Sequence, residues 1–149
     1  MADTAVALPG KWRARQMKLE AMAFLLLAKL LVSLVRFRRW SRWIGKPIDC
    51  PAGGQPVQAY DHFLAGIVRR AAEILPFHTK CLPRAMALHW MLHRRGRSGI
   101  LALGLLPREL RGTLDDLHAW VEMRGEIVLG ENGRQYRPLA KFGFSEAIA

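Results

Sequence analysis

The sequence has only two cysteines, which excludes a scaffold held together by several disulfides. They are Cys50 and Cys81. The N-terminal residues also lack the pattern of a cleavable secretion signal. We therefore expect a reducing, cytoplasmic location in which Cys81 is a free thiol.

Acidic residues are scarce as well, since 12 Asp and Glu stand against 23 Lys and Arg and leave a formal net charge of +11. The excess is uneven, because residues 1–46 hold ten basic and two acidic side chains, whereas residues 47–149 hold thirteen and ten. A positive surface suits nucleic acid, anionic lipid or an acidic peptide, and charge alone does not choose among them. A solvated basic helix without a specific partner is the plainer interpretation.

The sequence also lacks a convincing membrane span. The candidate is residues 21–35, AMAFLLLAKLLVSLV, which as a helix would reach about 22 Å against a hydrocarbon core of roughly 30 Å. Lys29 interrupts the run, and Trp40 and Trp43 follow it among arginines. We expect an amphipathic helix docked on the domain or on a partner, with peripheral membrane contact as the alternative.

Motifs for bound cofactors are missing too. The chain has no phosphate loop of the form G-x-x-x-x-G-K-[ST] and no H-E-x-x-H zinc motif. His89 and His93 have a spacing that can place two imidazoles on one metal, but no Glu follows His89. We expect both to be ordinary helix-face residues, and we expect neither a metal nor a cofactor.

The first part of the sequence predicts three helices. Apolar residues recur at helical spacing over residues 17–43 and again over residues 57–75. A third helix should begin near Cys81, with Thr79 as its cap, and should stop at Gly96.

Beyond the third helix the pattern changes to short apolar runs, which are ILALGLL, LHAWVEM and EIVLG. Such runs predict antiparallel strands, with a tight turn at residues 124–125 between the last two. The order predicts an α+β domain at residues 47–149, in which a helix packs on one face of a sheet. Residues 1–46 are expected to form a lead and a basic amphipathic helix before it.

Cys81 stands where a cysteine can become a nucleophile. A thiol reacts as the thiolate, and the unpaired N–H groups at a helix N-terminus favour that anion and can also hold an oxyanion. The strand LHAWVE supplies an imidazole, His118, to take up and return the proton. On spacing alone, a lone cysteine and a distant histidine are more often buried or incidental.

Alternation along the strand places His118, Trp120 and Glu122 on one face, so Trp120 is a candidate to flank the site. The returning strand of the hairpin brings Glu131 toward His118, which makes Glu131 the expected residue that orients the imidazole. His78 is a candidate to line the cleft. The alternatives to Glu131 are Asn132, Asp115 and Asp116.

The motifs around these residues resemble one family. A helix that reads CLPRAMALHWMLHRRG is followed by a Gly-containing strand and then by HAWVE. Together with the opening apolar helix, this combination resembles the lasso-peptide leader peptidases, the stand-alone transglutaminase-like type of maturation protein. The resemblance covers nearly the whole chain and implies a transglutaminase- and papain-like core, with the catalytic cysteine at a helix N-terminus packed on a small antiparallel sheet.

The resemblance also implies roles for residues. Cys81 would be the nucleophile and His118 the general base and acid, while Arg84 and Leu88 would be structural members of the motif helix. The family usually has Asp as the orienting residue. This chain has Gly130, Glu131 and Asn132 in that neighbourhood, and this departure leaves the third member open.

Three partners are implied by the same resemblance. They are a lasso precursor peptide, a separate recognition protein with a winged-helix fold that grips the leader, and an asparagine-synthetase-like cyclase that uses ATP to close the ring. No nucleic acid is implied. The predicted function is therefore cleavage of the leader from the precursor by a cysteine protease.

Two alternatives stay open at this point. The first is a non-catalytic basic adaptor that binds membrane or nucleic acid through residues 11–46. The second keeps the cysteine enzyme but transfers the acyl group to an amine, as transglutaminases do.

Overall fold

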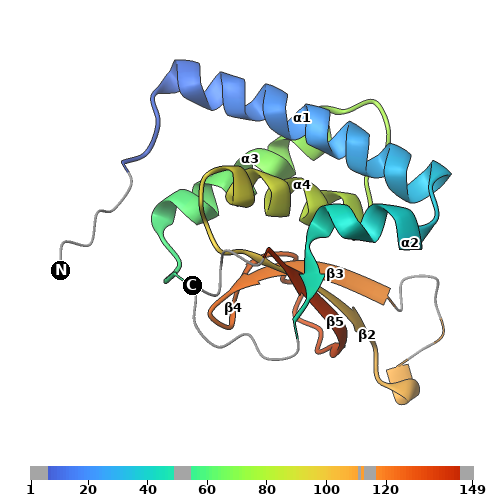
Figure 1. Cartoon of the computed structure of the whole chain (residues 1–149). Helices are drawn as coiled ribbons and strands as arrows, with labels where there is room; N and C mark the ends of the chain where they lie inside the picture. The colour runs from blue at the N-terminus through green and yellow to red at the C-terminus, as the bar shows by residue number, and fades with distance from the viewer. Residues whose placement is uncertain (1–6, 49–54, 111, 113–116, 145–149) are drawn as a thin grey trace.

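A layer of helices lies on one face of an antiparallel sheet (Figure 1). This computed structural model describes residues 7–48, 55–110, 112 and 117–144. The helices are α1 (Lys11–Leu34), α2 (Phe37–Trp40), α3 (Ala59–Ile74) and α4 (Cys81–Arg94), with short 3₁₀ turns at Ser41–Ile44 and Arg108–Leu110. The architecture is the predicted α+β arrangement.

The described strands form one five-stranded sheet with the order β1-β5-β2-β3-β4. The strands are β1 (Lys46–Pro47), β2 (Ile100–Leu105), β3 (Leu117–Met123), β4 (Glu126–Leu129) and β5 (Arg137–Gly143). Arg124 and Gly125, with φ of 49° and 81°, form the predicted turn between β3 and β4. Strands β1 and β5 were not predicted from the sequence. In β5, Pro138 interrupts the alternation, and the pairing with β2 shifts register between Leu103 and Gly104.

The continuous helix predicted over residues 17–43 is wrong. Helix α1 ends at Leu34, and Val35 is extended, with φ of −117° and ψ of 139°. The chain then turns back, so that Trp40 and Ile44 are buried at 4% and 0% exposure. A straight continuation would carry these two side chains away from the core. Trp40 thus anchors the segment to the core of the domain, whereas Trp43 is 51% exposed.

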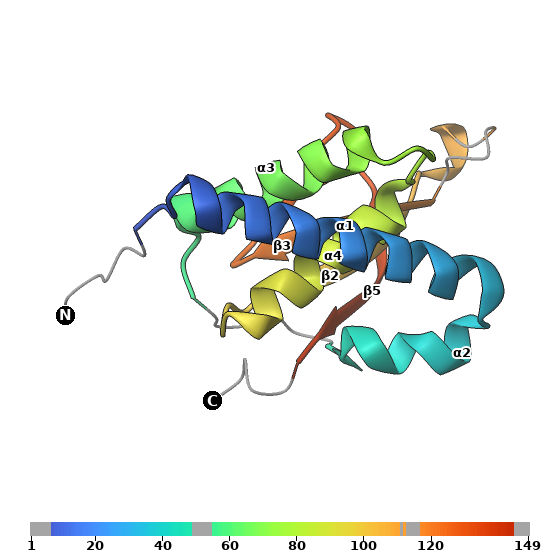
Figure 2. The same ribbon diagram turned by 90° about the horizontal axis from the view of Figure 1, so that it is seen from above.

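Helix α4 is the centre of the core. It packs against α1, α3 and β3, and the two views show it between the sheet and α1 (Figures 1 and 2). Helix α1 contributes Met17, Ala21 and Leu25 to the same buried cluster, and its small alanine allows close packing between the helices. No helix among the described residues is long and apolar enough to cross a membrane.

Ion pairs fasten the C-terminal end of α4 and the turn after it to the other helices. Glu20 of α1 accepts hydrogen bonds from Arg95 at 2.7 Å and from Arg94 at 2.8 Å. Asp61 of α3 is fully buried and pairs with Arg97 at 2.6 Å. Because a buried carboxylate is costly unless it is paired, these contacts fix how α1 and α3 sit on α4.

Candidate active site

Cys81 is the first residue of α4, so its side chain stands at the N-terminal end of the helix. The residue before it, Lys80, is the N-cap and makes no side-chain capping bond. The prediction that Thr79 caps the helix is wrong, because its Oγ1 instead accepts a hydrogen bond from Arg84 Nε at 3.2 Å. The backbone N–H of Leu82 donates to the Cys81 sulfur, as expected for a helix start that favours a thiolate.

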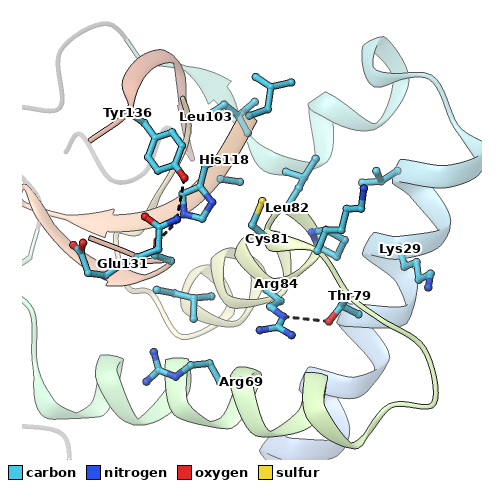
Figure 3. Close-up of a pocket in the computed structure, with 18 of the residues that line it drawn as sticks. Lys29, Arg69, Thr79, Cys81, Leu82, Arg84, Leu103, His118, Glu131 and Tyr136 are labelled. Carbon is cyan, nitrogen blue, oxygen red and sulfur yellow. Dashed lines mark hydrogen bonds between the residues drawn. The ribbon is translucent and has the colours of Figure 1, made fainter. Parts of the chain in front are cut away.

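The imidazole of His118 faces Cys81 from β3 (Figure 3). Its Nε2 lies 2.6 Å from the backbone carbonyl oxygen of Gly130. A carbonyl oxygen only accepts, so Nε2 carries the proton of this bond and leaves Nδ1 for the thiol. The Cys81 thiol and the His118 imidazole face each other closely enough to interact.

The two groups shift each other's pKa in opposite directions. Burial alone would raise the pKa of Cys81, but the hydrogen bond from His118, the backbone N–H of Ala119 and the charge of His118 outweigh it, and the pKa is lowered. The hydrogen bond to Cys81 raises the pKa of His118 against the opposing effect of burial. Both shifts favour a thiolate paired with an imidazolium, the reactive form of a catalytic cysteine.

Gly130 has the backbone conformation that presents its carbonyl to His118. Its φ is +102°, and a Cβ at this position would lie 2.8 Å from Cβ of Trp120 and 3.0 Å from the carbonyl oxygen of Ala119. A residue with a side chain would therefore be strained and crowded here. Sequence reasoning noted Gly130 only as a neighbour of Glu131, although a glycine directly after a strand is a recognisable signal.

Glu131 does not take the orienting role in the expected way. Its Oε1 accepts a hydrogen bond from the N–H of Gly133 at 3.0 Å. Among the described residues, the imidazole's second hydrogen bond goes to Gly130 rather than to the Glu131 carboxylate. Glu131 still acts on His118 through its charge, which contributes to the raised pKa of the imidazole.

None of the other candidate residues is seen to orient the His118 imidazole in the described part of the chain. Asn132 donates from Nδ2 to the Tyr136 hydroxyl oxygen at 2.9 Å and is used there. Asp115 and Asp116 lie outside the described residues. A backbone carbonyl thus takes the place that the sequence assigned to a side chain.

Cys81 and His118 both line a cleft of about 1110 Å³. His78 lines this cleft, as predicted, and its carbonyl oxygen accepts a hydrogen bond from Lys29 Nζ at 3.2 Å. Helix α1 forms part of the wall through Lys29, Val32 and Ser33, a contact that no sequence pattern predicted. The lining of the cleft also includes Leu82, Arg84, Leu103, Leu117, Leu129 and Tyr136.

Trp120 lies behind His118 rather than in the cleft. It is 6% exposed, and its ring centroid is 6.1 Å from that of His118. Its Nε1 donates to Glu122 at 2.9 Å, which confirms that His118, Trp120 and Glu122 share one face of β3. Trp120 and His118 both line a second, smaller cavity of about 500 Å³, so Trp120 flanks the imidazole as expected, and a role for it in substrate binding stays a prediction.

Two contributors to the site were missed from the sequence. The ring of Tyr136 stacks against His118 with centroids 4.7 Å apart. The backbone N–H of Ala119, next to His118 in β3, donates to the Cys81 sulfur. Tyr136 directly precedes β5. Because that strand was not predicted, no sequence pattern placed the Tyr136 ring near the imidazole of His118.

The helix-face histidines are engaged in packing. His89 is 1% exposed, and its Nε2 donates to the carbonyl oxygen of Ile44 at 2.8 Å. Burial lowers the pKa of His89 to about 4, so its ring is neutral. The ring of His93 stacks on Phe144 with centroids 3.7 Å apart. No group of three or more potential metal ligands occurs among the described residues.

Comparison with known proteins gives one match. The sequence model described as the transglutaminase-like superfamily matches residues 24–141, which is well over half of the chain. No curated protein and no solved structure matches the chain. The matched range runs from α1 into β5 and contains Cys81, His118 and Gly130.

Proposed function

The chain belongs to the transglutaminase-like superfamily, and we propose that it is a cysteine protease that removes the leader from a lasso-peptide precursor. Members of this superfamily are often cysteine hydrolases or transferases. The observation that carries the catalytic part is the interacting pair of Cys81 and His118 at the start of α4, open to a large cleft.

The proposed chemistry is acyl transfer to water. The Cys81 thiolate attacks the carbonyl carbon of the last leader residue, and the oxyanion that forms accepts hydrogen bonds from backbone N–H groups near the start of α4. The His118 imidazolium gives its proton to the leaving amine, so the core peptide departs with a free N-terminus. A water molecule deprotonated by His118 then hydrolyses the thioester, releasing the leader acid and restoring the thiol.

The substrate assignment rests on the sequence motifs. The helix CLPRAMALHW and the strand HAWVE resemble the lasso-peptide leader peptidases, and both motifs meet at the site. The resemblance supports a lasso precursor as substrate, a separate winged-helix recognition protein and a downstream asparagine-synthetase-like cyclase. The charge of Glu131, which helps to raise the pKa of His118, supports a weaker role for Glu131 in catalysis.

The test is mass spectrometry of the cognate precursor incubated with the protein and its recognition partner. Wild type should cleave at one leader–core junction, and folded Cys81→Ala and His118→Ala variants should leave the precursor intact. If the variants cleave as well as wild type, the catalytic assignment is wrong. Binding of the precursor without cleavage by any of the three proteins would favour the basic adaptor instead.

Acyl transfer to an amine is the second candidate, and superfamily membership favours it to the same degree. The two reactions share the thioester and differ only in the acceptor. The mass of the released leader separates them, because hydrolysis adds the elements of water whereas transfer adds those of the amine.

The outer face of α1 supports a partner role for this helix. Leu19, Leu26 and Leu30 are 66%, 46% and 46% exposed on the side away from the core. We propose that this face contacts the recognition protein, with peripheral membrane contact as the alternative. Deleting α1 would expose the core residues that it covers, so the test uses Leu19→Gln with Leu26→Gln. Complex formation at wild-type strength by this variant would refute the assignment.

A further inference from the structure

The wall of the cleft carries far more positive than negative charge. Five cationic side chains line it, and Glu131 is the single carboxylate among the described lining residues. The five are Lys29, Arg69, Lys80, Arg84 and Arg134.

These cations lack carboxylate partners within the described part of the chain. The ion pairs of the structure lie elsewhere, as at the far end of α4, where Arg94 and Arg95 pair with Glu20. Lys29 and Arg84 bind backbone or hydroxyl oxygens, which leave their charge uncompensated. Like charges that surround one cleft repel each other, and an anionic ligand would relieve that repulsion.

The charge is not spread evenly around the thiol. Figure 3 shows Arg84 and Arg69 on the side of Cys81 that faces α3, and Leu103 on the opposite side. Exposed apolar side chains complete the rest of the wall, among them Phe37 at 47% and Leu139 at 60% exposure. An extended peptide that carries both carboxylates and apolar side chains matches this division, whereas a nucleic acid backbone matches only the charge.

From this division we propose that the cleft selects a peptide with acidic side chains close to the bond that Cys81 attacks. Its carboxylates lie toward Arg69 and Arg84, and its apolar side chains lie against the wall formed by Phe37, Leu103 and Leu139. This inference rests on the proposed function, because it names the class of peptide that the protease takes.

The experiment measures binding, so that it does not depend on catalysis. The full chain with Cys81→Ala is titrated against a fluorescein-labelled decapeptide of glutamate and leucine, and against a matched peptide with glutamine in place of glutamate. Arg69→Glu with Arg134→Glu reverses two exposed charges of the wall. Arg70→Glu with Arg137→Glu is the matched control, because it changes the net charge equally at exposed arginines outside the cleft.

The protein should bind the glutamate peptide roughly fivefold more tightly than the glutamine peptide, since one exposed ion pair contributes up to about that factor. The variant with Arg69→Glu and Arg134→Glu should lose this preference, and the control with Arg70→Glu and Arg137→Glu should keep it. Circular dichroism should show that both are folded.

Three results would overturn the inference: equal affinity for the two peptides, equal loss of preference in the two double variants, or displacement of the glutamate peptide by a shorter single-stranded oligonucleotide at lower concentration. Precursor cleavage through Cys81 without the glutamate preference would refute this inference alone. A clear preference combined with an intact precursor would support the inference and refute the protease assignment.

Discussion

Two histidines in this protein make the same kind of hydrogen bond, to a backbone carbonyl oxygen, but their pKa values are shifted in opposite directions. Nε2 of His118 donates to a backbone carbonyl at 2.6 Å, and Nε2 of His89 donates to another at 2.8 Å. The pKa of His118 is raised, whereas burial lowers the pKa of His89 to about 4. The shared hydrogen bond therefore does not decide the protonation state.

The difference lies at the other ring nitrogen. Nδ1 of His89 is buried without a hydrogen-bond partner, and the charge of nearby His93 disfavours a second proton further. The corresponding side of His118 meets the Cys81 thiol and the open cleft, where a thiolate stabilises the imidazolium. The imidazole of His118 can take up a second proton because of its second neighbour, the Cys81 thiol, whereas the fold keeps the imidazole of His89 neutral by enclosing it.

The largest expected effect comes from removing the buried imidazole with His89→Gln, whose amide can still donate to the Ile44 carbonyl. The pKa of His89 is lower in the folded protein than the usual 6.5, so its contribution to stability is present above pH 6.5 and is lost as pH falls toward about 4. Between these pH values the wild-type free energy of unfolding should fall by about 3 kcal/mol more than that of the variant.

Urea unfolding at several pH values measures this difference. Parallel pH profiles for the two proteins would contradict the buried, neutral assignment of His89. His93→Gln is the control, because His93 is an exposed residue and its replacement leaves the burial of His89, the largest cause of the lowered pKa, in place.

A smaller effect is expected from Gly130→Ala, which disturbs the carbonyl that anchors His118. The left-handed φ and the crowding by Trp120 should lower the free energy of unfolding by about 1 to 3 kcal/mol. Because the imidazole loses its fixed orientation, cleavage by the folded variant should fall more than its peptide binding does. Gly133→Ala, also at positive φ but with no atom within 4 Å of a Cβ, is the control that keeps the strain and leaves the anchor intact.

The smallest structural change is Cys81→Ala, which should alter only one of the two histidines. The hydrogen bond to Cys81 is the largest cause of the raised pKa of His118, so the NMR titration midpoint of this ring should move to lower pH. The titration of His89 should not change. A shift in both rings, or in neither, would show that the thiol is not what distinguishes them.

Several features of the candidate site could be predicted from the sequence. The helix start at Cys81, the alternation that places His118 and Trp120 on one face, and the turn at Arg124 and Gly125 all follow from short-range patterns. Local rules of this kind depend only on neighbouring residues.

What the sequence could not predict depends on contacts between distant segments. The carbonyl of Gly130 replaces a side-chain carboxylate at His118, and no residue type identifies a backbone acceptor in advance. The break at Val35 follows from the burial of Trp40 and Ile44, which only the assembled core determines. The burial of His89 against Ile44 has the same origin.

The most direct test of the central claim is the rate at which iodoacetamide alkylates Cys81 as a function of pH, in a Cys50→Ser background with and without His118→Ala. The account predicts that Cys81 stays reactive below the usual pKa of a thiol. It also predicts that removing His118 moves the inflection to higher pH and slows alkylation at neutral pH by about tenfold. Identical profiles for the two proteins would contradict it, because His118 would then have no part in forming the thiolate.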